Sequence, residues 1–113
     1  EDDEPVVVAA ALDALAWLGD EGVGAAVERA LAHPNDEVFQ AGLRAAHTLP
    51  ERTAERFVGK GLSHPAWNVR MLAIKLLLDI DTARTRELLN DALRGEKDTM
   101  VRHAIESGLQ VGE

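Results

Sequence analysis

The chain has 113 residues, of which 46% are hydrophobic and only 4% aromatic, and it contains no cysteine. This length suits one domain or a short array of repeats, and the lack of cysteine excludes disulfides and thiolate metal sites. The apolar run at residues 6–12 is far shorter than the roughly 20 residues of a membrane span, and the acidic N-terminus is unlike a signal peptide. We therefore expect a cytoplasmic protein built from closely packed helices.

The formal net charge of -8 is unevenly distributed along the chain. Residues 1–37 hold ten acidic residues and one basic residue, whereas residues 38–113 hold ten acidic and eleven basic residues. Proteins that bind nucleic acid usually display a basic surface that replaces the phosphate counterions. The acidic N-terminal third therefore argues against a nucleic-acid partner.

Apolar residues recur at helical spacing in seven segments of the chain. In chain order the predicted helices are 5–18, 22–33, 37–49, 52–63, 67–80, 83–94 and 98–111. Proline disfavours a helical conformation for the residue before it, so His33-Pro34 and His64-Pro65 mark two helix ends. Asn35, Asp36 or Asp98 can cap the helix that follows its turn.

The second helix of each predicted pair repeats every 31 residues. The repeat begins at four apolar marker residues, Val7, Val38, Val69 and Met100. Small residues stand four positions after the markers, at Ala11, Gly42, Ala73 and Ala104, and branched aliphatic residues follow them. The first helices share this period through columns such as Val27, Val58 and Leu89. In the last unit Ser107 and Gly108 replace bulkier residues, so that unit is either an end unit or shifted by one residue.

The turn and the second helix of this unit resemble a known repeat. His64-Pro65 followed by Val69-Arg70 and Ala73 is similar to the short HEAT-like repeats of the bilin-lyase type, and Val101-Arg102 supplies the dipeptide one residue late. The units at Val7 and Val38 lack the arginine. The resemblance covers essentially the whole chain and implies an all-α fold. This fold is a right-handed α-α superhelix, or HEAT-like solenoid, of about 3.5 two-helix repeats and seven helices.

The predicted array begins in the middle of a repeat, because helix 5–18 has no first helix before it. Residues 6–12 of that helix are apolar nearly all round, whereas a terminal repeat normally presents a polar outer face. We therefore expect residues 1–113 to form a single HEAT-like domain excised from a longer protein. The alternative is that this apolar face contacts another chain, and the oligomeric state stays open.

The resemblance implies a binding scaffold in which the second helices line the concave face of the solenoid. Candidate partner-binding residues lie opposite the core stripe of those helices, at Asp13, Trp17, Gln40, Arg44, His47, Met71, Lys75, Leu78, Arg102 and Glu106. Trp17, Met71 and Leu78 are the expected apolar anchors, because aromatic and methionine side chains are enriched where interfaces gain most of their energy. Arg44, Lys75 and Arg102 would favour an acidic partner surface. The alternative is that Trp17 and Leu78 pack against neighbouring helices.

One further aromatic residue, Trp67, lies in a turn. We expect it to act as a lid on the core between two helices, and the alternative is an exposed contact.

No catalytic, metal or cofactor site is predicted. His33 and His64 occupy equivalent positions, roughly 10 Å apart by helix packing distance, and cannot share a metal ion. Ser63 and Ser107 lack a Ser-His-acid arrangement. The glycines at 19, 22 and 24 lack the lysine and threonine of a phosphate-binding loop. We therefore predict a protein-binding scaffold that is not an enzyme.

Two other functions stay open at this point. The chain could be an enzyme or enzyme subunit, either bilin-lyase-like or similar to HEAT-type DNA glycosylases, since Asp13 and Trp17 lie four residues apart on one helix face. It could also be a structural spacer, which predicts no concentrated apolar patch on the second-helix face.

Overall fold

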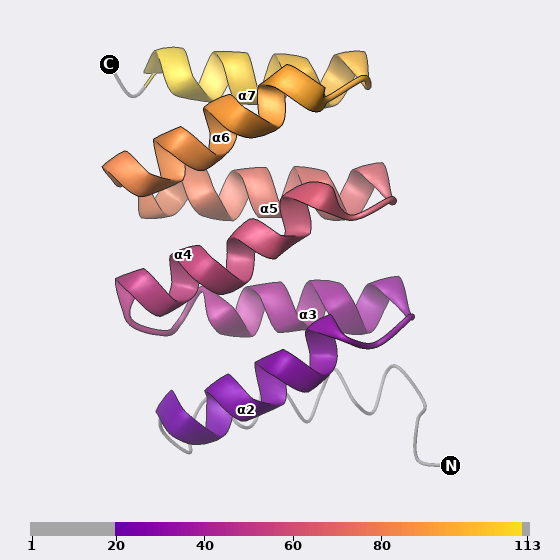
Figure 1. Ribbon diagram of the computed structural model, residues 1–113, viewed down its shortest axis with the longest axis vertical. Coiled ribbons are helices and arrows are strands. Elements are labelled where there is room, and N and C mark those ends of the chain that lie inside the picture. The colour runs from indigo at the N-terminus through magenta and orange to yellow at the C-terminus, as the bar shows by residue number, and fades with distance from the viewer. Residues whose placement is uncertain (1–19, 112–113) are drawn as a thin grey trace. The chain divides into compact units, whose positions relative to one another are not determined.

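A computed structural model describes residues 20–111 (Figure 1). In this part of the chain the regular elements are six α-helices and one short 3-10 helix, with no strand. They are α2 (Asp20–Leu31), α3 (Asp36–Ala46), α4 (Glu51–Gly59), the 3-10 helix η2 (Lys60–Ser63), α5 (Trp67–Ile80), α6 (Ala83–Gly95) and α7 (Thr99–Val111). The all-helical prediction is confirmed for these residues, and the predicted helix 5–18 with its marker Val7 lies outside them.

The chain divides into two units, residues 1–57 and 58–113, which we call the N-terminal and C-terminal units. In the N-terminal unit, α2 packs against α3, and the buried side chains include Val27, Val38 and Leu43. Gly42 permits this close approach, because a Cβ atom at that position would lie 2.9 Å from the Cβ of Ala30. The small residue that the repeat requires here is therefore a condition of helix packing.

In the C-terminal unit, α5 is the central helix. It packs against η2, α6 and α7, and α6 also packs against α7. Figure 1 shows α5 and α7 lying side by side with α6 crossing in front of them. The fully buried side chains of this unit come from all these α-helices and are Val58, Val69, Ile74, Leu77, Thr85, Leu89, Val101 and Ile105.

Local side-chain chemistry explains where these helices begin and end. The Asn35 side chain accepts hydrogen bonds from the N–H groups of Glu37 and Val38 and so caps α3. Thr82 and Thr85 form a reciprocal capping box at the start of α6. Helix α5 ends at Asp81, which adopts the left-handed conformation with φ 55°, a conformation that aspartate tolerates better than most residues.

The last repeat differs from the predicted register by one residue. The marker predicted at Met100 is 66% exposed, whereas Val101 is fully buried. The carboxylate of Asp98 caps the N–H groups of Met100 and Val101, as Asn35 does for Glu37 and Val38. The spacing from Val69 to Val101 is therefore 32 residues.

The extra residue lies in the turn before α7. Leu89 still follows Val58 by 31 residues, and both are buried, so α6 keeps the original register. The register changes only between α6 and the Asp98 cap, where a turn absorbs one residue without disturbing either helix. The marker at Met100 is thus corrected to Val101.

Candidate functional site: the second-helix face

Each turn that leads into a second helix is closed by the same type of hydrogen bond. The N–H of Asn35 donates to Nδ1 of His33, and the N–H of Ala66 donates to Nδ1 of His64, both at 3.0 Å. In the third turn the N–H of Asp98 donates to a carboxylate oxygen of Glu96, also at 3.0 Å. The two histidines therefore act as turn-forming acceptors. No group of three or more potential metal ligands occurs in the described part of the chain.

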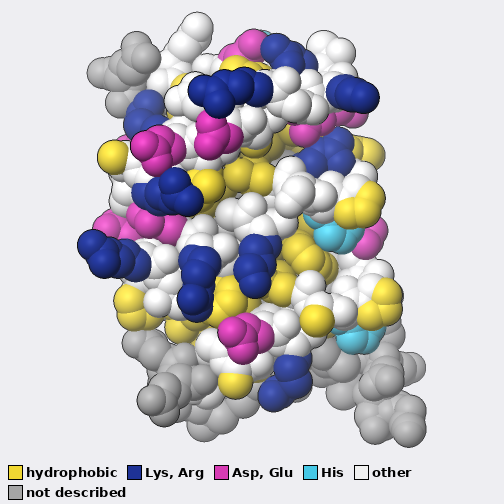
Figure 2. Space-filling model, in the orientation of Figure 1, with side chains coloured by type: hydrophobic (Ala, Val, Ile, Leu, Met, Phe, Trp, Pro, Cys, Tyr) yellow, Lys and Arg dark blue, Asp and Glu magenta, His cyan; other side chains and the backbone are white. Residues whose placement is uncertain are grey.

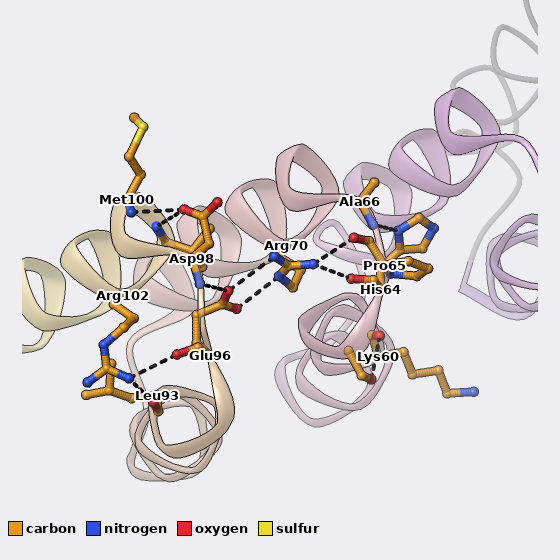
Figure 3. A network of polar contacts seen from close by, with 12 residues as sticks. Lys60, His64, Pro65, Ala66, Arg70, Leu93, Glu96, Asp98, Met100 and Arg102 are labelled. Carbon is orange, nitrogen blue, oxygen red and sulfur yellow. Dashed lines mark hydrogen bonds and ion pairs between the residues drawn. The ribbon is translucent and has the colours of Figure 1, made fainter.

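An ion pair joins two of these turns within the C-terminal unit (Figure 3). Nε and Nη2 of Arg70 donate to the two carboxylate oxygens of Glu96 at 2.9 and 3.1 Å. Nη1 of Arg70 donates to the carbonyl oxygens of His64 and Pro65, both at 2.9 Å. The two side chains are only 18% and 7% exposed. A bidentate, charge-assisted pair of this kind is strong and directional, and it ties the turn before α5 to the turn before α7.

Arg102 repeats half of this arrangement one repeat later. Its Nη1 donates to the carbonyl oxygens of Leu93 and Glu96 at 2.9 and 3.0 Å, as Nη1 of Arg70 does in the preceding turn. Its Nη2 lies 4.0 Å from the carboxylate of Glu106. Arg102 is therefore the equivalent of Arg70, although the predicted register made it the equivalent of Met71.

The one-residue shift changes which side chains of α7 correspond to the candidates on α5. Counted from Val101, the equivalents of Met71 and Lys75 are His103 and Ser107, which the sequence reasoning missed. His103 is exposed, and its Nε2 lies 3.3 Å from the hydroxyl of Ser107. The late Val101-Arg102 dipeptide was the signal that could have identified them.

The candidates on α5 are placed differently from one another. Met71 is half-buried and Lys75 is exposed, so both reach the surface of the second helix. Leu78 packs against α7, because a Cβ atom on Gly108 would lie 3.1 Å from the Cγ of Leu78. Leu78 therefore behaves as the packing alternative described, while Met71 and Lys75 lie one helical turn apart on one face.

In the N-terminal unit the described candidates lie on α3 and the residue that follows it. Arg44 is exposed, and Gln40 and His47 are half-buried. Asp13 and Trp17 lie outside the described residues. The structure thus brings candidates together separately within each unit, on α3 in one and on α5 in the other.

Trp67, the first residue of α5, is 52% exposed. The lid expected at this position is therefore not formed, and the indole is largely available to solvent. Trp67 and Met71 are four residues apart and so share one face of α5. Met100 occupies the corresponding end of α7 with its side chain 66% exposed, and Figure 3 shows this side chain extending away from the turn network.

The first-helix surface of the C-terminal unit has a different character. On α6, Arg84 pairs with Glu87 at 3.1 Å and Arg94 pairs with Asp91 at 2.9 Å. Figure 2 shows basic and acidic side chains interspersed over this helix. Because these charges neutralise one another and are solvent-exposed, they keep the surface hydrated rather than forming an apolar contact area.

A groove of about 700 Å³ separates the turn before α5 from the turn before α7. Its lining includes Arg70 and Glu96, which bond to each other, and the capping residue Asp98. Small-molecule sites are usually mostly apolar concavities with a few free polar groups. This groove has neither property, so the exposed side chains of the second helices remain the candidate site.

A family model described as HEAT repeats matches residues 25–110. The chain belongs to the HEAT-repeat family. HEAT repeats generally serve as protein-interaction scaffolds and are generally not catalytic. No curated protein matches the chain. Within residues 20–111, the helices of this HEAT-repeat chain are too short or too polar to cross a membrane.

Proposed function

We propose that this HEAT-repeat chain is a protein–protein interaction module whose partner binds the surface formed by its second helices. One observation carries the proposal. Among the described residues, the two large apolar side chains that are strongly exposed, Trp67 and Met100, both lie on second helices. Such side chains cost free energy in water and contribute strongly to interfaces when a partner covers them.

The burial pattern of α5 supports the same surface. Val69, Ala73 and Leu77 are buried on one side of the helix, while Met71 and Lys75 reach the surface on another. A pure spacer would need no apolar side chains on the surface of its second helices. The exposed Trp67 therefore favours a binding role over a spacer.

The proposal includes the wider arrangement that the repeat pattern predicts. We expect the repeats to form one right-handed α-α superhelix of about 3.5 repeats, with the second helices on its concave face. We expect this module to act in the cytoplasm as part of a longer protein and to use binding rather than catalysis. The regular 31-residue period and the family match support this arrangement.

Site-specific photo-crosslinking tests the proposed surface. A photoreactive amino acid at Gln40 or Lys75 reports on second helices, and the same group at Glu28 or Arg84 provides exposed controls on first helices. These positions give one test and one control in each unit. In the full-length protein under native conditions, we expect discrete crosslinked products from the test positions and few from the controls. Equal or stronger crosslinking from Glu28 and Arg84 would place the interface elsewhere.

A further inference from the structure

We propose that the second-helix surface of the C-terminal unit binds an amphipathic protein segment with two features. The segment presents apolar side chains to Trp67 and Met100, and it presents an acidic side chain to Lys75. This inference rests on the proposed function and names the chemistry of the partner.

The apolar part of this surface spans two packed helices. Trp67 and Met71 share one face of α5 because they are four residues apart. On α7, His103 is the equivalent of Met71 and lies three residues after Met100, so Met100 and His103 also share a face. Since α5 and α7 pack side by side, Met100 lies beside the end of α5 that carries Trp67. We call Trp67, Met71 and Met100 the apolar patch.

The charge next to the apolar patch is positive and uncompensated. Lys75 follows Met71 by one helical turn and is exposed. In the C-terminal unit, acidic residues are largely committed elsewhere. Glu96, Glu87, Asp81, Asp91 and Glu106 each lie within ion-pair distance of an arginine, and Asp98 caps α7. None of the described carboxylates is paired with Lys75, which leaves this ammonium group available to a partner.

The surface also lacks carboxylates that would repel an acidic segment. At the positions of α7 that correspond to Met71 and Lys75 stand His103 and Ser107, which contact each other. Glu106 lies on a different stripe of α7, next to Arg102. An acidic group approaching Lys75 therefore meets a cation and neutral side chains, whereas a basic group meets repulsion.

Helix geometry sets the spacing that the partner needs. Trp67 and Lys75 are eight residues apart on α5, which corresponds to about 12 Å along the helix axis. A helical partner segment lying along α5 matches this distance when its apolar and acidic residues are about two turns apart. Helix-in-groove recognition uses anchors at this kind of spacing, and methionine side chains adapt to the shape of such an anchor.

Two fluorescein-labelled alanine-based helical peptides test this chemistry. Each carries leucines on one face of its first two turns, and the next two turns carry glutamates in one peptide and lysines at the same positions in the other. Fluorescence anisotropy with the whole chain measures both affinities. We expect the glutamate peptide to bind at least about tenfold more tightly than the lysine peptide. Failure of the glutamate peptide to bind, or equal binding of both, would overturn the inference.

Variants of exposed residues locate the contact. We expect Trp67→Ala and Met100→Ala each to weaken the glutamate peptide at least about fivefold, and Lys75→Glu to reverse the preference between peptides. Arg84→Glu makes the same charge change on the first-helix surface and should leave both affinities unchanged. Circular dichroism confirms that each variant is folded. Binding that survives both alanine changes would overturn the inference.

The peptide result and the crosslinking result separate two kinds of failure. If crosslinks form from Lys75 but the glutamate peptide does not bind, the second-helix surface is correct and the partner chemistry is wrong. If neither occurs, the surface itself is wrong. The two proposals can therefore fail independently.

Discussion

Helices α5 and α7 hold the same place in successive repeats, yet they treat the same stripe of residues differently. On α5 this stripe consists of Arg70, Ile74 and Leu78, which respectively bond to Glu96, lie fully buried and pack against Gly108. On α7 it consists of Arg102, Glu106 and Gln110, of which Glu106 and Gln110 are exposed. The residue at a repeat position is therefore set by what covers it, since the repeat alone would place an aliphatic side chain at 106.

The comparison also separates two roles for the arginine that follows the marker valine. Both Arg70 and Arg102 bond to carbonyl oxygens of their own turn. Only Arg70 also holds a carboxylate from the next repeat, through both edges of its fork. The first role shapes a turn, and the second joins two repeats.

Exchanging the residues at the middle of the stripe gives the largest expected effect. Ile74→Glu places a carboxylate where a side chain is 1% exposed, and we expect it to lower the free energy of unfolding by at least about 4 kcal/mol. Glu106→Ile changes a side chain that is 51% exposed and should alter it by no more than about 0.5 kcal/mol. Urea denaturation measures both values, and similar losses for the two variants would contradict the assignment.

Removing each arginine should produce a smaller but still unequal loss. Arg70→Ala leaves the Glu96 carboxylate buried without its partner, which we expect to cost about 3 kcal/mol. Arg102→Ala removes two hydrogen bonds from a more exposed guanidinium and should cost about 1 kcal/mol. Thermal and urea unfolding of the two variants can be compared directly. A larger loss for Arg102→Ala would show that the link between turns is not the main contribution.

The smallest expected effects concern the helix caps. Asp98→Ala removes the acceptor for the N–H groups of Met100 and Val101 and should destabilise the chain by about 1 kcal/mol. Helix α5 has no side-chain cap at Ala66, whose backbone is already extended. Ala66→Asp should therefore stabilise by up to about 1 kcal/mol. Destabilisation by Ala66→Asp would indicate that the turn at His64 cannot accommodate the new side chain.

Most of the local architecture could be predicted from the sequence, because caps and prolines act on neighbouring residues. The segment 67–80 was predicted as a helix and is found as α5 with the same bounds, and Asn35 caps α3 as expected. The register of the last repeat was not predictable in the same way. Met100 and Val101 are both apolar, so either could serve as the marker, and only packing against α5 and α6 selects Val101.

The candidate site was predicted less completely than the fold, because exposure depends on distant parts of the chain. Met71 and Lys75 reach the surface as the helical spacing indicated, but Leu78 is covered by α7. His103 and Ser107 were missed because they follow the insertion in the preceding turn. Trp67 was expected to cover a core and is exposed instead, since a helix-end aromatic residue can turn either way until its neighbours are placed.

The sequence by itself determined an all-helical repeat, its 31-residue period through most of the described chain and the caps that begin several helices. These features depend on helical periodicity and on hydrogen bonds between residues a few positions apart. The tertiary structure decided that Val101 replaces Met100 in the core, that Arg70 reaches Glu96 across 26 positions, and that Trp67 remains exposed. Each of these depends on which helices meet, because burial and long-range ion pairing are properties of packed neighbours rather than of a single segment.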